Sequence, residues 1–335
     1  MTGEPAFSRF RPLVEQGLRH ALEDGPSELV RVSRYVMGWE DEHGRPTSGG
    51  GKRLRPLLCL EVAAALGAAP EAALPGAVAV ELVHNFSLVH DDIQDGDVLR
   101  HGRPTAWKLV GQAQAINLGN FLYTRGLRQL AECDLPGAAA ALDMLFVAVE
   151  RMVAGQWEDI AFESAGRVSE SEYLAMVEGK TGALLGAAAG IGAALAGADP
   201  LLAGQFRLWG ERLGLAFQVH DDYLGTWGNA AETGKSTSSD IVRRKRTLPV
   251  VYALSRRADG PLHRYYRESG DDERALPSVE TVAALLEETG AREHCLELAT
   301  RLASEADDLL TIPERRGARV DRLRALARYI VQRDR

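Results

Sequence analysis

The chain is poor in cysteine and in long apolar runs. Its 335 residues include only three cysteines, Cys59, Cys133 and Cys295, which lie far apart without a CxxC pair. This spacing excludes a disulfide framework and a cysteine-ligated zinc site, and we expect a reduced, cytoplasmic environment. The longest apolar run, Ala183 to Ala198, falls short of the roughly 18 residues that indicate a membrane span. We therefore predict no transmembrane segment and a closely packed core helix at that run.

An excess of basic residues is also missing. The chain has 39 Lys and Arg against 47 Asp and Glu, which gives a formal net charge of −8. This balance argues against a nucleic-acid partner, because binding to a phosphate backbone needs a basic face. Apolar residues make up 45% of the chain, which is enough for a core and too much for intrinsic disorder. Any anion site must therefore be a local cluster of basic residues.

Strand signals are scarce as well. Runs in which β-branched and polar residues alternate are almost absent, whereas Ala, Leu, Glu and Arg dominate. Clusters of Gly, Pro, Asn, Asp and Ser separate windows of helical length, and no long linker interrupts them. We predict an all-α fold with a single domain over residues 1–335, in which residues 1–8 form a flexible N-terminal segment.

The segment 82–95 carries the first chemical motif. It reads LVHNFSLVHDDIQD and predicts an apolar helix with one polar stripe. Asp91 and Asp95 lie one helical turn apart on that stripe, where like charges repel unless a cation is bound. Such oxygen ligands suit Mg²⁺, which takes one or two carboxylates together with phosphate oxygens and water. For this DDxxD motif taken alone, a solvated acidic helix end is the alternative.

A second acidic pair, Asp221 and Asp222, follows another apolar run, LGLAFQVHDD. Two carboxylate pairs at the ends of buried helices indicate several metal ions that bind one anion. Basic residues stand near both motifs, and Arg and Lys side chains both suit phosphate oxygens. The candidate phosphate-binding residues are Lys52, Arg53, Arg55, Arg100, Arg103, Lys180, Lys235 and Lys245.

Taken together, these motifs resemble the trans-polyprenyl diphosphate synthase family, and most closely its short-motif geranylgeranyl and farnesyl diphosphate synthases. The resemblance covers most of the chain, and the motifs match in order and approximate spacing. They are GGGKRLRP at 49–56, the block 84–95 with Arg100 and 103–105, 155–156 with Asp159, 180–181, 217–218 with 221–222, and 234–235 through 247–249. The resemblance implies antiparallel helices around a deep central cavity, and a homodimer.

The resemblance also implies a reaction and a set of residues. Family members join isopentenyl diphosphate to an allylic diphosphate such as dimethylallyl, geranyl or farnesyl diphosphate, with three Mg²⁺ ions per active site. The implied metal ligands are Asp91, Asp92, Asp95, Asp221 and Asp222. The residues implied for the allylic diphosphate are Arg100, Lys180, Thr181, Gln218, Lys235 and Lys245, and those for isopentenyl diphosphate are Lys52, Arg55 and His84. Among these, the aspartates, Arg100 and Lys180 are implied to act in catalysis.

Two positions depart from the usual family pattern. His101 stands where the family has a second adjacent arginine that binds isopentenyl diphosphate, and a neutral imidazole cannot give a bidentate fork. Losing one charge-assisted contact costs on the order of 1.5–3 kcal/mol unless Arg103 or Arg53 replaces it. Gly225 stands where the second motif usually has a third acid.

These departures keep a non-catalytic partner subunit open as one alternative to an elongating prenyltransferase. The other alternative is a class I terpene cyclase, which also ionises a diphosphate at an aspartate motif. A cyclase would pair that motif with an Asn/Ser/Glu triad. This chain instead repeats its aspartates and keeps the segment GGGKRLRP, so prenyl elongation is the leading hypothesis.

Product length depends on the residues just before the first motif. With a rise of 1.5 Å per residue, Ser87 and Phe86 lie roughly 6–7.5 Å along the helix before Asp91. In the family that the chain resembles, an aromatic residue at the fifth position before a short motif is typical of a twenty-carbon product. We therefore predict geranylgeranyl diphosphate as the product, with farnesyl diphosphate as the alternative.

Overall fold

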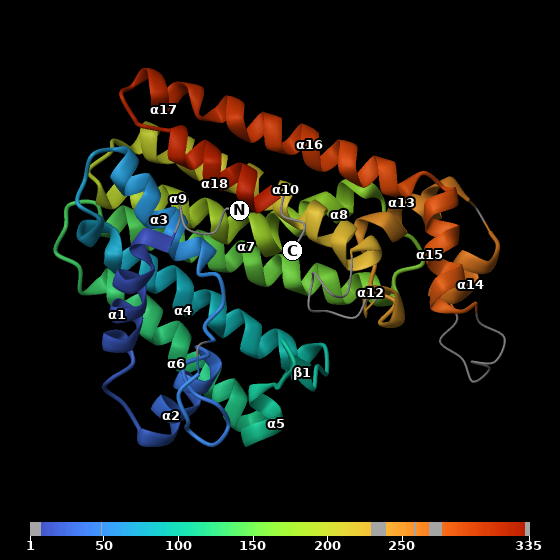
Figure 1. Ribbon diagram of the computed structural model, residues 1–335, viewed down its shortest axis with the longest axis horizontal. Coiled ribbons are helices and arrows are strands. Elements are labelled where there is room, and N and C mark those ends of the chain that lie inside the picture. The colour runs from blue at the N-terminus through green and yellow to red at the C-terminus, as the bar shows by residue number, and fades with distance from the viewer. Residues whose placement is uncertain (1–7, 48, 229–238, 258, 268–276, 332–335) are drawn as a thin grey trace. The chain divides into compact units, whose positions relative to one another are not determined.

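The computed structural model is almost entirely helical, as the sequence predicts (Figure 1). It describes residues 8–47, 49–228, 239–257, 259–267 and 277–331. Within these ranges the only sheet is a ribbon of two short antiparallel strands, β1 (Leu99–Arg100) and β2 (Arg103–Pro104). The predicted flexible segment 1–8 lies outside the described residues except for Ser8, and Lys235 lies outside them entirely.

The chain forms two compact units, each assembled from three separate segments. The first unit comprises residues 1–149, 184–210 and 309–326, and the second comprises 150–183, 211–308 and 327–335. Several long helices contribute residues to both units.

In the first unit the central element is α4, which packs on α6, α3 and α1. A proline at its first position has the backbone torsion that a helix start needs. The elements of this unit are η1 (Ser8–Phe10), α1 (Arg11–Ala21), α2 (Ser27–Val36), α3 (Leu54–Ala65), α4 (Pro70–Gln94), β1, β2, α5 (Ala106–Val110), α6 (Gln112–Ala131), the first part of α7 (Ala138–Ser164), α9 (Ala183–Leu195), the first part of α10 (Pro200–Trp227), α17 (Thr311–Arg315) and the first part of α18 (Asp321–Val331).

Two apolar helices follow from the composition of the chain. Every residue of α9 is buried, which confirms the predicted core helix at the Ala-rich and Gly-rich run. Among the described residues, α4 is the helix that is long and apolar enough to cross a membrane. Its most apolar window is 61% buried inside the structure, as in the core helix of a globular protein.

The second unit begins where α7 crosses from one unit to the other. Its helix α8 starts with a capping box, in which Ser169 and Glu172 each accept a hydrogen bond from the other's backbone N–H. Its elements are the second part of α7, α8 (Glu170–Val177), the π-helical turn η2 (Glu178–Gly182), the second part of α10, α12 (Ser239–Val242), α13 (Leu248–Arg256), α14 (Pro261–Arg267), α15 (Val279–Glu288) and α16 (Ala291–Leu309).

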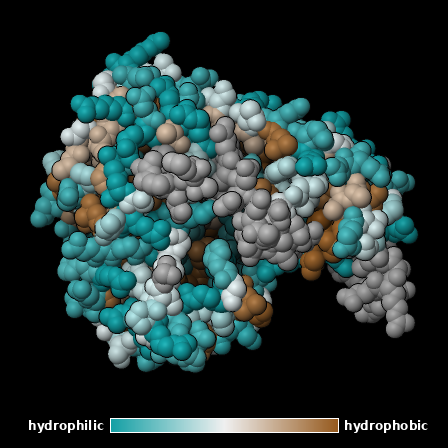
Figure 2. Space-filling view, viewed as in Figure 1, coloured by the Kyte–Doolittle hydropathy of each residue, from teal (hydrophilic) through white to brown (hydrophobic). Residues whose placement is uncertain are grey.

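Apolar side chains also reach the surface. The face seen in Figure 2 is mostly hydrophilic, with scattered hydrophobic patches. Among the described helices, α7 exposes the most large apolar side chains, and Trp157 is 78% exposed. The others on this helix are Phe146, Val147, Val153 and Ile160.

Candidate functional site

The first acidic motif lies at the C-terminal end of α4, where Asp92 is only 5% exposed. Arg100 in β1 donates from Nε to Oδ1 of Asp92 at 2.8 Å, and its Nη2 lies 2.7 Å from the same oxygen. Burial raises the pKa of Asp92 to about 6, and the positive charge of Arg100 opposes that rise. The motif therefore contains a buried carboxylate paired with a guanidinium, while Asp91 lies 3.9 Å from Arg100.

The β1–β2 ribbon brings Arg100 to this position. His101 and Gly102 have φ angles of 51° and 75°, the left-handed backbone that a two-residue hairpin turn requires. Arg103, opposite Arg100 in the ribbon, donates to the carbonyl of Glu40 at 2.7 Å. Its guanidinium also lies over the ring of Tyr35, 4.1 Å from the centroid. The ribbon is thus fixed by one arginine and presents the other to Asp92.

Arg53 does not fit the role of a replacement for the arginine missing at position 101. Its guanidinium donates to Glu15, Glu81 and the carbonyl of Met37, at 2.9, 2.9 and 2.8 Å. The residue is 5% exposed, so these contacts form a buried ion-pair network. Arg53 is a structural residue of the first unit.

Arg55 and His84 form a pair that suits an anion. Nη1 of Arg55 lies 3.1 Å from Nε2 of His84. Burial lowers the pKa of His84 well below its ordinary value, and the charge of Arg55 lowers it further, so the imidazole is neutral and accepts this hydrogen bond. Burial also lowers the pKa of Arg55, to about 10. Its Nε is buried without a hydrogen-bond partner among the described residues, which leaves a donor for an anionic ligand.

These side chains line one cavity of about 520 Å³ within the first unit, a volume in the range of small-molecule sites. Eight of the predicted site residues line it, together with Glu81 and Asn85, which the sequence did not indicate. The eight are Lys52, Arg53, Arg55, His84, Asp92, Arg100, His101 and Arg103. Four others are not among the lining residues, namely Asp91, Asp95, Phe86 and Ser87.

Phe86 lies on a different face of α4 from the cavity-lining residues. Its ring meets His90 edge-on at a centroid distance of 4.8 Å and is tilted against Tyr123 of α6 at 5.1 Å. The hydroxyl of Ser87 donates to the carbonyl of His84 at 2.8 Å. The influence of Phe86 and Ser87 on product length stays a prediction.

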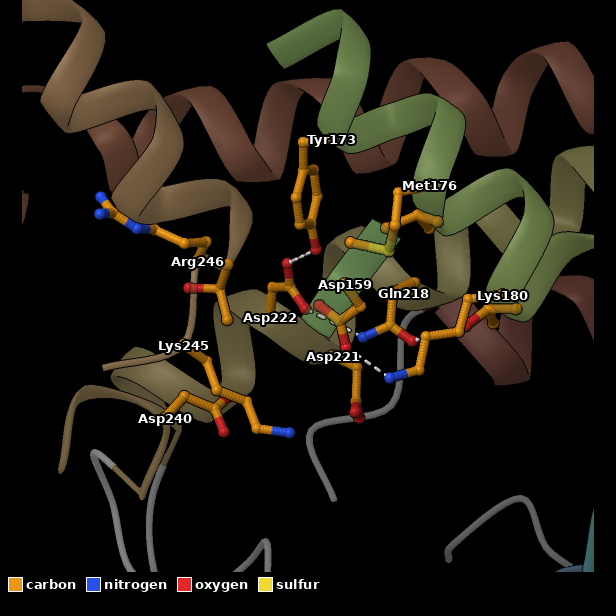
Figure 3. Close-up of a pocket in the computed structure, with 13 residues that line it drawn as sticks. Asp159, Tyr173, Met176, Lys180, Gln218, Asp221, Asp222, Asp240, Lys245 and Arg246 are labelled. Atoms are coloured by element: carbon orange, nitrogen blue, oxygen red, sulfur yellow. Dashed lines mark hydrogen bonds and ion pairs between the residues drawn. The ribbon is translucent and has the colours of Figure 1, made fainter. Parts of the chain in front are cut away.

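The second acidic motif lies on α10 in the second unit, where Asp222 is 3% exposed (Figure 3). The Tyr173 hydroxyl and the backbone N–H of Leu248 both donate to its Oδ2, the latter at 2.9 Å. Gln218 donates to Oδ1, also at 2.9 Å. Burial raises the pKa of Asp222 to about 7, and these donors oppose that rise. Asp222 is thus a carboxylate held by neutral donors.

Lys180 and Thr181 lie in η2, and π-helical turns of this kind are frequent at functional sites. Nζ of Lys180 donates to Asp159 of α7 at 2.6 Å, and Thr181 donates to Gln218 at 3.0 Å. Gly155 permits this close approach, because an added Cβ would overlap the backbone nitrogen of Lys180. Gly155 therefore lets η2 pack against α7, and Asp159 binds Lys180 at this contact.

The second unit also contains a cavity, of about 170 Å³ (Figure 3). Six of the predicted site residues line this cavity, namely Lys180, Thr181, Gln218, Asp221, Asp222 and Lys245. Sequence reasoning missed Tyr173 and Asp240 and gave Asp159 no function. Tyr173 stands seven residues before Lys180, two helical turns away, a spacing that could have indicated it.

Neither cavity contains a preformed metal cage. Among the described residues, no group of three or more His, Cys, Asp and Glu side chains has a metal-binding arrangement. The donor set consists of carboxylate oxygens beside cationic side chains. It fits Mg²⁺ bound together with phosphate oxygens and water, because Mg²⁺ needs only one or two protein carboxylates.

Comparison with known proteins gives a consistent result. Residues 44–282 match the family model described as polyprenyl synthetase. The (2E,6E)-farnesyl diphosphate synthase of Mycobacterium tuberculosis H37Rv is 39% identical over 98% of this chain and 93% of its own length. The geranylgeranyl diphosphate synthase of the same strain is 39% identical over 77% of this chain and 74% of its own length. A polyprenyl synthetase crystal structure from Streptomyces coelicolor A3(2) superposes with a TM-score of 0.90, at 42% identity, over 97% of this chain and 98% of that one.

Proposed function

Since the chain belongs to the polyprenyl synthetase family, we propose that it is a trans-prenyltransferase that joins isopentenyl diphosphate head-to-tail to an allylic diphosphate. The observation that carries this proposal is the chemistry of the cavities: each unit gathers acidic and basic residues of the family motifs around one. Because the family match includes residues of both units, we also propose that they belong to one synthase domain.

The aspartates would hold the metal ions. Bound Mg²⁺ supplies positive charge that stabilises the departing pyrophosphate. Asp92 and Asp222 accept hydrogen bonds from protein donors, which fix the position of one carboxylate in each motif. We propose three Mg²⁺ ions, as in the family that the motifs resemble, with the ligand set Asp91, Asp92, Asp95, Asp221 and Asp222.

The basic residues would bind the two diphosphates. For the allylic diphosphate, Arg100 and Lys180 are supported by their ion pairs with Asp92 and Asp159, which fix each cation beside an acid. Positive groups at fixed positions stabilise the charge that develops on a leaving diphosphate. The other residues that we assign to the allylic diphosphate are Thr181, Gln218, Lys235 and Lys245.

For isopentenyl diphosphate we propose Lys52, Arg55 and His84, with His101 and Arg103 at the same cavity. The buried, unpartnered Nε of Arg55 supports this assignment, because an anion would satisfy that donor. Cleavage of the carbon–oxygen bond of the allylic diphosphate leaves an allylic cation and pyrophosphate. The double bond of isopentenyl diphosphate attacks this cation, and the new carbocation loses a proton to the released pyrophosphate to give the elongated product.

We propose geranylgeranyl diphosphate as the product. The test is to incubate the purified protein with labelled isopentenyl diphosphate, Mg²⁺ and dimethylallyl, geranyl or farnesyl diphosphate, and to size the dephosphorylated products. We expect a linear twenty-carbon alcohol. A fifteen-carbon alcohol would make the protein a farnesyl diphosphate synthase, like the Mycobacterium tuberculosis relative that aligns with 98% of the chain.

Other outcomes of this assay would overturn the reaction itself. Cyclic products would indicate a terpene cyclase, and turnover only after addition of a partner synthase would indicate a non-catalytic subunit. Phe86→Ala should lengthen the product. An unchanged product length would place the determinant elsewhere.

We propose that the protein is a homodimer whose subunits meet on α7. The exposed apolar side chains of α7, led by Trp157 at 78%, support this proposal because burying them in an interface is favourable. Sedimentation should give twice the chain mass for the parent protein and a smaller mass for Trp157→Glu. A monomeric parent chain would exclude the dimer.

We also propose a cytoplasmic location. Its support is that Cys59, Cys133 and Cys295 are all free thiols, as in proteins of a reducing compartment. Fractionation of cells that express the tagged chain tests this location, and recovery in a secreted fraction would contradict it.

A further inference from the structure

The turn that carries Lys180 and Thr181 departs from α-helical geometry. In η2 the backbone N–H of Ala183 donates to the carbonyl of Glu178, five residues earlier, whereas an α-helix pairs residues four apart. The turn therefore holds one residue more than an α-helical turn. Because π-helical turns are rare, we expect contacts from neighbouring elements that stabilise this one.

The backbones of α7 and α10 both lie against η2. An ideal Cβ built on Gly179 would lie 2.8 Å from the carbonyl oxygen of Arg151 on α7. A Cβ built on Gly182 would lie 3.2 Å from the carbonyl oxygen of Glu211 on α10. Both distances are tighter than nine in ten real Cβ contacts, so glycine at these positions lets the turn lie against both helices.

The side chain of Arg151 links the same three elements of the second unit. Its Nη1 donates to the carboxylate of Glu211 on α10, and its Nη2 donates to Oε1 of Glu178 in η2 at 3.3 Å. Glu211 is 6% exposed, and a buried carboxylate is stable only with a cation or hydrogen-bond donors beside it. One guanidinium group therefore connects α7 to α10 and to the first residue of η2.

Arg151 belongs to the face of α7 that meets Lys180. Arg151, Gly155 and Asp159 are spaced four residues apart, so they follow one stripe of the helix. Gly155 lies against the backbone of Lys180, and Asp159 accepts from its Nζ at 2.6 Å (Figure 3). Arg151 thus binds the start of η2 at Glu178, and Asp159 binds the ammonium group that the turn presents.

We propose that Arg151 is a positioning residue, which holds η2 in its π-helical form so that Lys180 and Thr181 line the cavity of the second unit. The inference rests on the proposed function, in which both residues bind the allylic diphosphate. Arg151 itself is not among the lining residues of that cavity. Because each residue of an α-helix turns by about 100°, loss of the extra residue from the turn would rotate Lys180 away from its present face.

Hydrogen exchange of the full-length chain tests the hold on the turn without any substrate. Arg151→Met removes both hydrogen bonds, and we expect the amides of 178–183 to exchange about tenfold faster, the size of a lost hydrogen bond. Glu178→Ala keeps the Arg151–Glu211 pair and should accelerate exchange only about threefold, because the Glu178 side chain is 48% exposed. Arg212→Met is the matched control on α10, where Arg212 pairs with Glu305 at the surface, and should exchange like the parent chain.

Binding measurements test the consequence for the site. In calorimetry with Mg²⁺, Arg151→Met should bind geranyl diphosphate on the order of tenfold more weakly and isopentenyl diphosphate with parental affinity. Arg212→Met should bind both like the parent chain. If Arg151 acts through Lys180, the double variant Arg151→Met with Lys180→Met should bind geranyl diphosphate no more weakly than Lys180→Met alone.

The outcomes separate this inference from folding and from the proposed function. Parental exchange of 178–183 in Arg151→Met overturns the inference. A lower melting temperature with parental affinity for geranyl diphosphate also overturns it, because Arg151 would then only stabilise the fold. Additive losses in the double variant have the same consequence. A parent chain that elongates no isoprenoid overturns the proposed function, whereas faster exchange in Arg151→Met supports the hold on η2 whichever reaction the protein catalyses.

Discussion

The two acidic motifs differ in what surrounds their second aspartate. Asp92 pairs with the guanidinium of Arg100, so that pair is electrically neutral. Asp222 instead accepts hydrogen bonds from a hydroxyl, an amide and a backbone N–H, and it keeps a full negative charge when ionised. Burial raises the pKa of both, to about 6 and about 7. The second motif therefore presents a net negative charge as large as that of the first, although it has one motif aspartate fewer.

The largest expected effects come from removing the first aspartate of either motif. Asp91→Ala and Asp221→Ala should each lower kcat by roughly 10²–10³-fold or more, because loss of a group that holds charge at the reacting diphosphate is of that size. Steady-state kinetics over a Mg²⁺ titration measure this loss. If both motifs hold metal, the loss will be large in both variants. Near-parental kcat in one of them would show that its motif is structural.

A matched substitution guards against a general effect of lost charge. Asp143 is an exposed acid on α7 that lines neither cavity, and Asp143→Ala should keep the parental kcat. A comparable loss in that variant would contradict the assignment of the motif aspartates.

The next effect tests the neutral donors of the second motif. Tyr173→Phe removes one hydrogen bond to a charged acceptor, which is worth about 1.5–3 kcal/mol, or roughly 10–150-fold. We expect kcat to fall and the Mg²⁺ concentration for half-maximal turnover to rise by a factor in this range. The KM for isopentenyl diphosphate should stay unchanged. Tyr252→Phe is the control, since Tyr252 stacks on His294 and does not line the cavity. A fall in melting temperature alone would mean that the Tyr173 hydroxyl only stabilises the fold.

The helices and the acidic residues could be predicted because they follow from local patterns. Helical periodicity places Asp91 and Asp95 on one stripe, and the composition of α9 predicts its burial. Both predictions require only the residues of one helix. The same holds for Lys180 and Thr181, whose neighbours in the chain mark the motif.

The partners of these residues could not be predicted, because tertiary packing decides them. Periodicity defines the faces of a helix and leaves open which element packs against each face. Tyr173 on α8 donates to Asp222, a contact that no local pattern indicates. Arg100 reaches Asp92 because a two-residue turn at His101 and Gly102 forms the β1–β2 ribbon, which the sequence did not predict. Phe86 shows the same limit, since its predicted position along the helix says nothing of its contact with Tyr123 of α6.

A smaller effect is expected at the turn of the β1–β2 ribbon. His101 lines the cavity of the first unit, and His101→Arg would add a permanent charge there. We expect the KM for isopentenyl diphosphate to fall on the order of tenfold, since one charge-assisted hydrogen bond is worth at least about 1.5 kcal/mol. His43→Arg adds the same charge at an exposed position of the first unit and should leave KM unchanged. An unchanged KM in His101→Arg would show that this position does not contact the substrate. The cavity of the first unit would then need no second arginine in the β1–β2 turn.

The smallest effect concerns the pH dependence of the free energy of unfolding, to which the buried imidazole of His84 contributes. Burial, together with the positive charges of Arg55, Arg100 and Arg53, holds the pKa of His84 well below its ordinary value of 6.5. Below pH 6.5 the unfolded chain takes up a proton that the folded chain refuses, so this histidine lowers the free energy of unfolding as pH falls, by at most about 1.4 kcal/mol per pH unit. Above pH 6.5 the effect is absent. His84→Gln removes the titration and should flatten the stability profile between pH 6.5 and 5.5 in urea unfolding, whereas His43→Gln, at an exposed histidine, should leave it unchanged. A parental slope in His84→Gln would mean that the imidazole is protonated in the folded chain. The first unit would then contain a further cation beside its arginines. The difference between its charged site and the neutral hydrogen-bond donors around Asp222 would be larger.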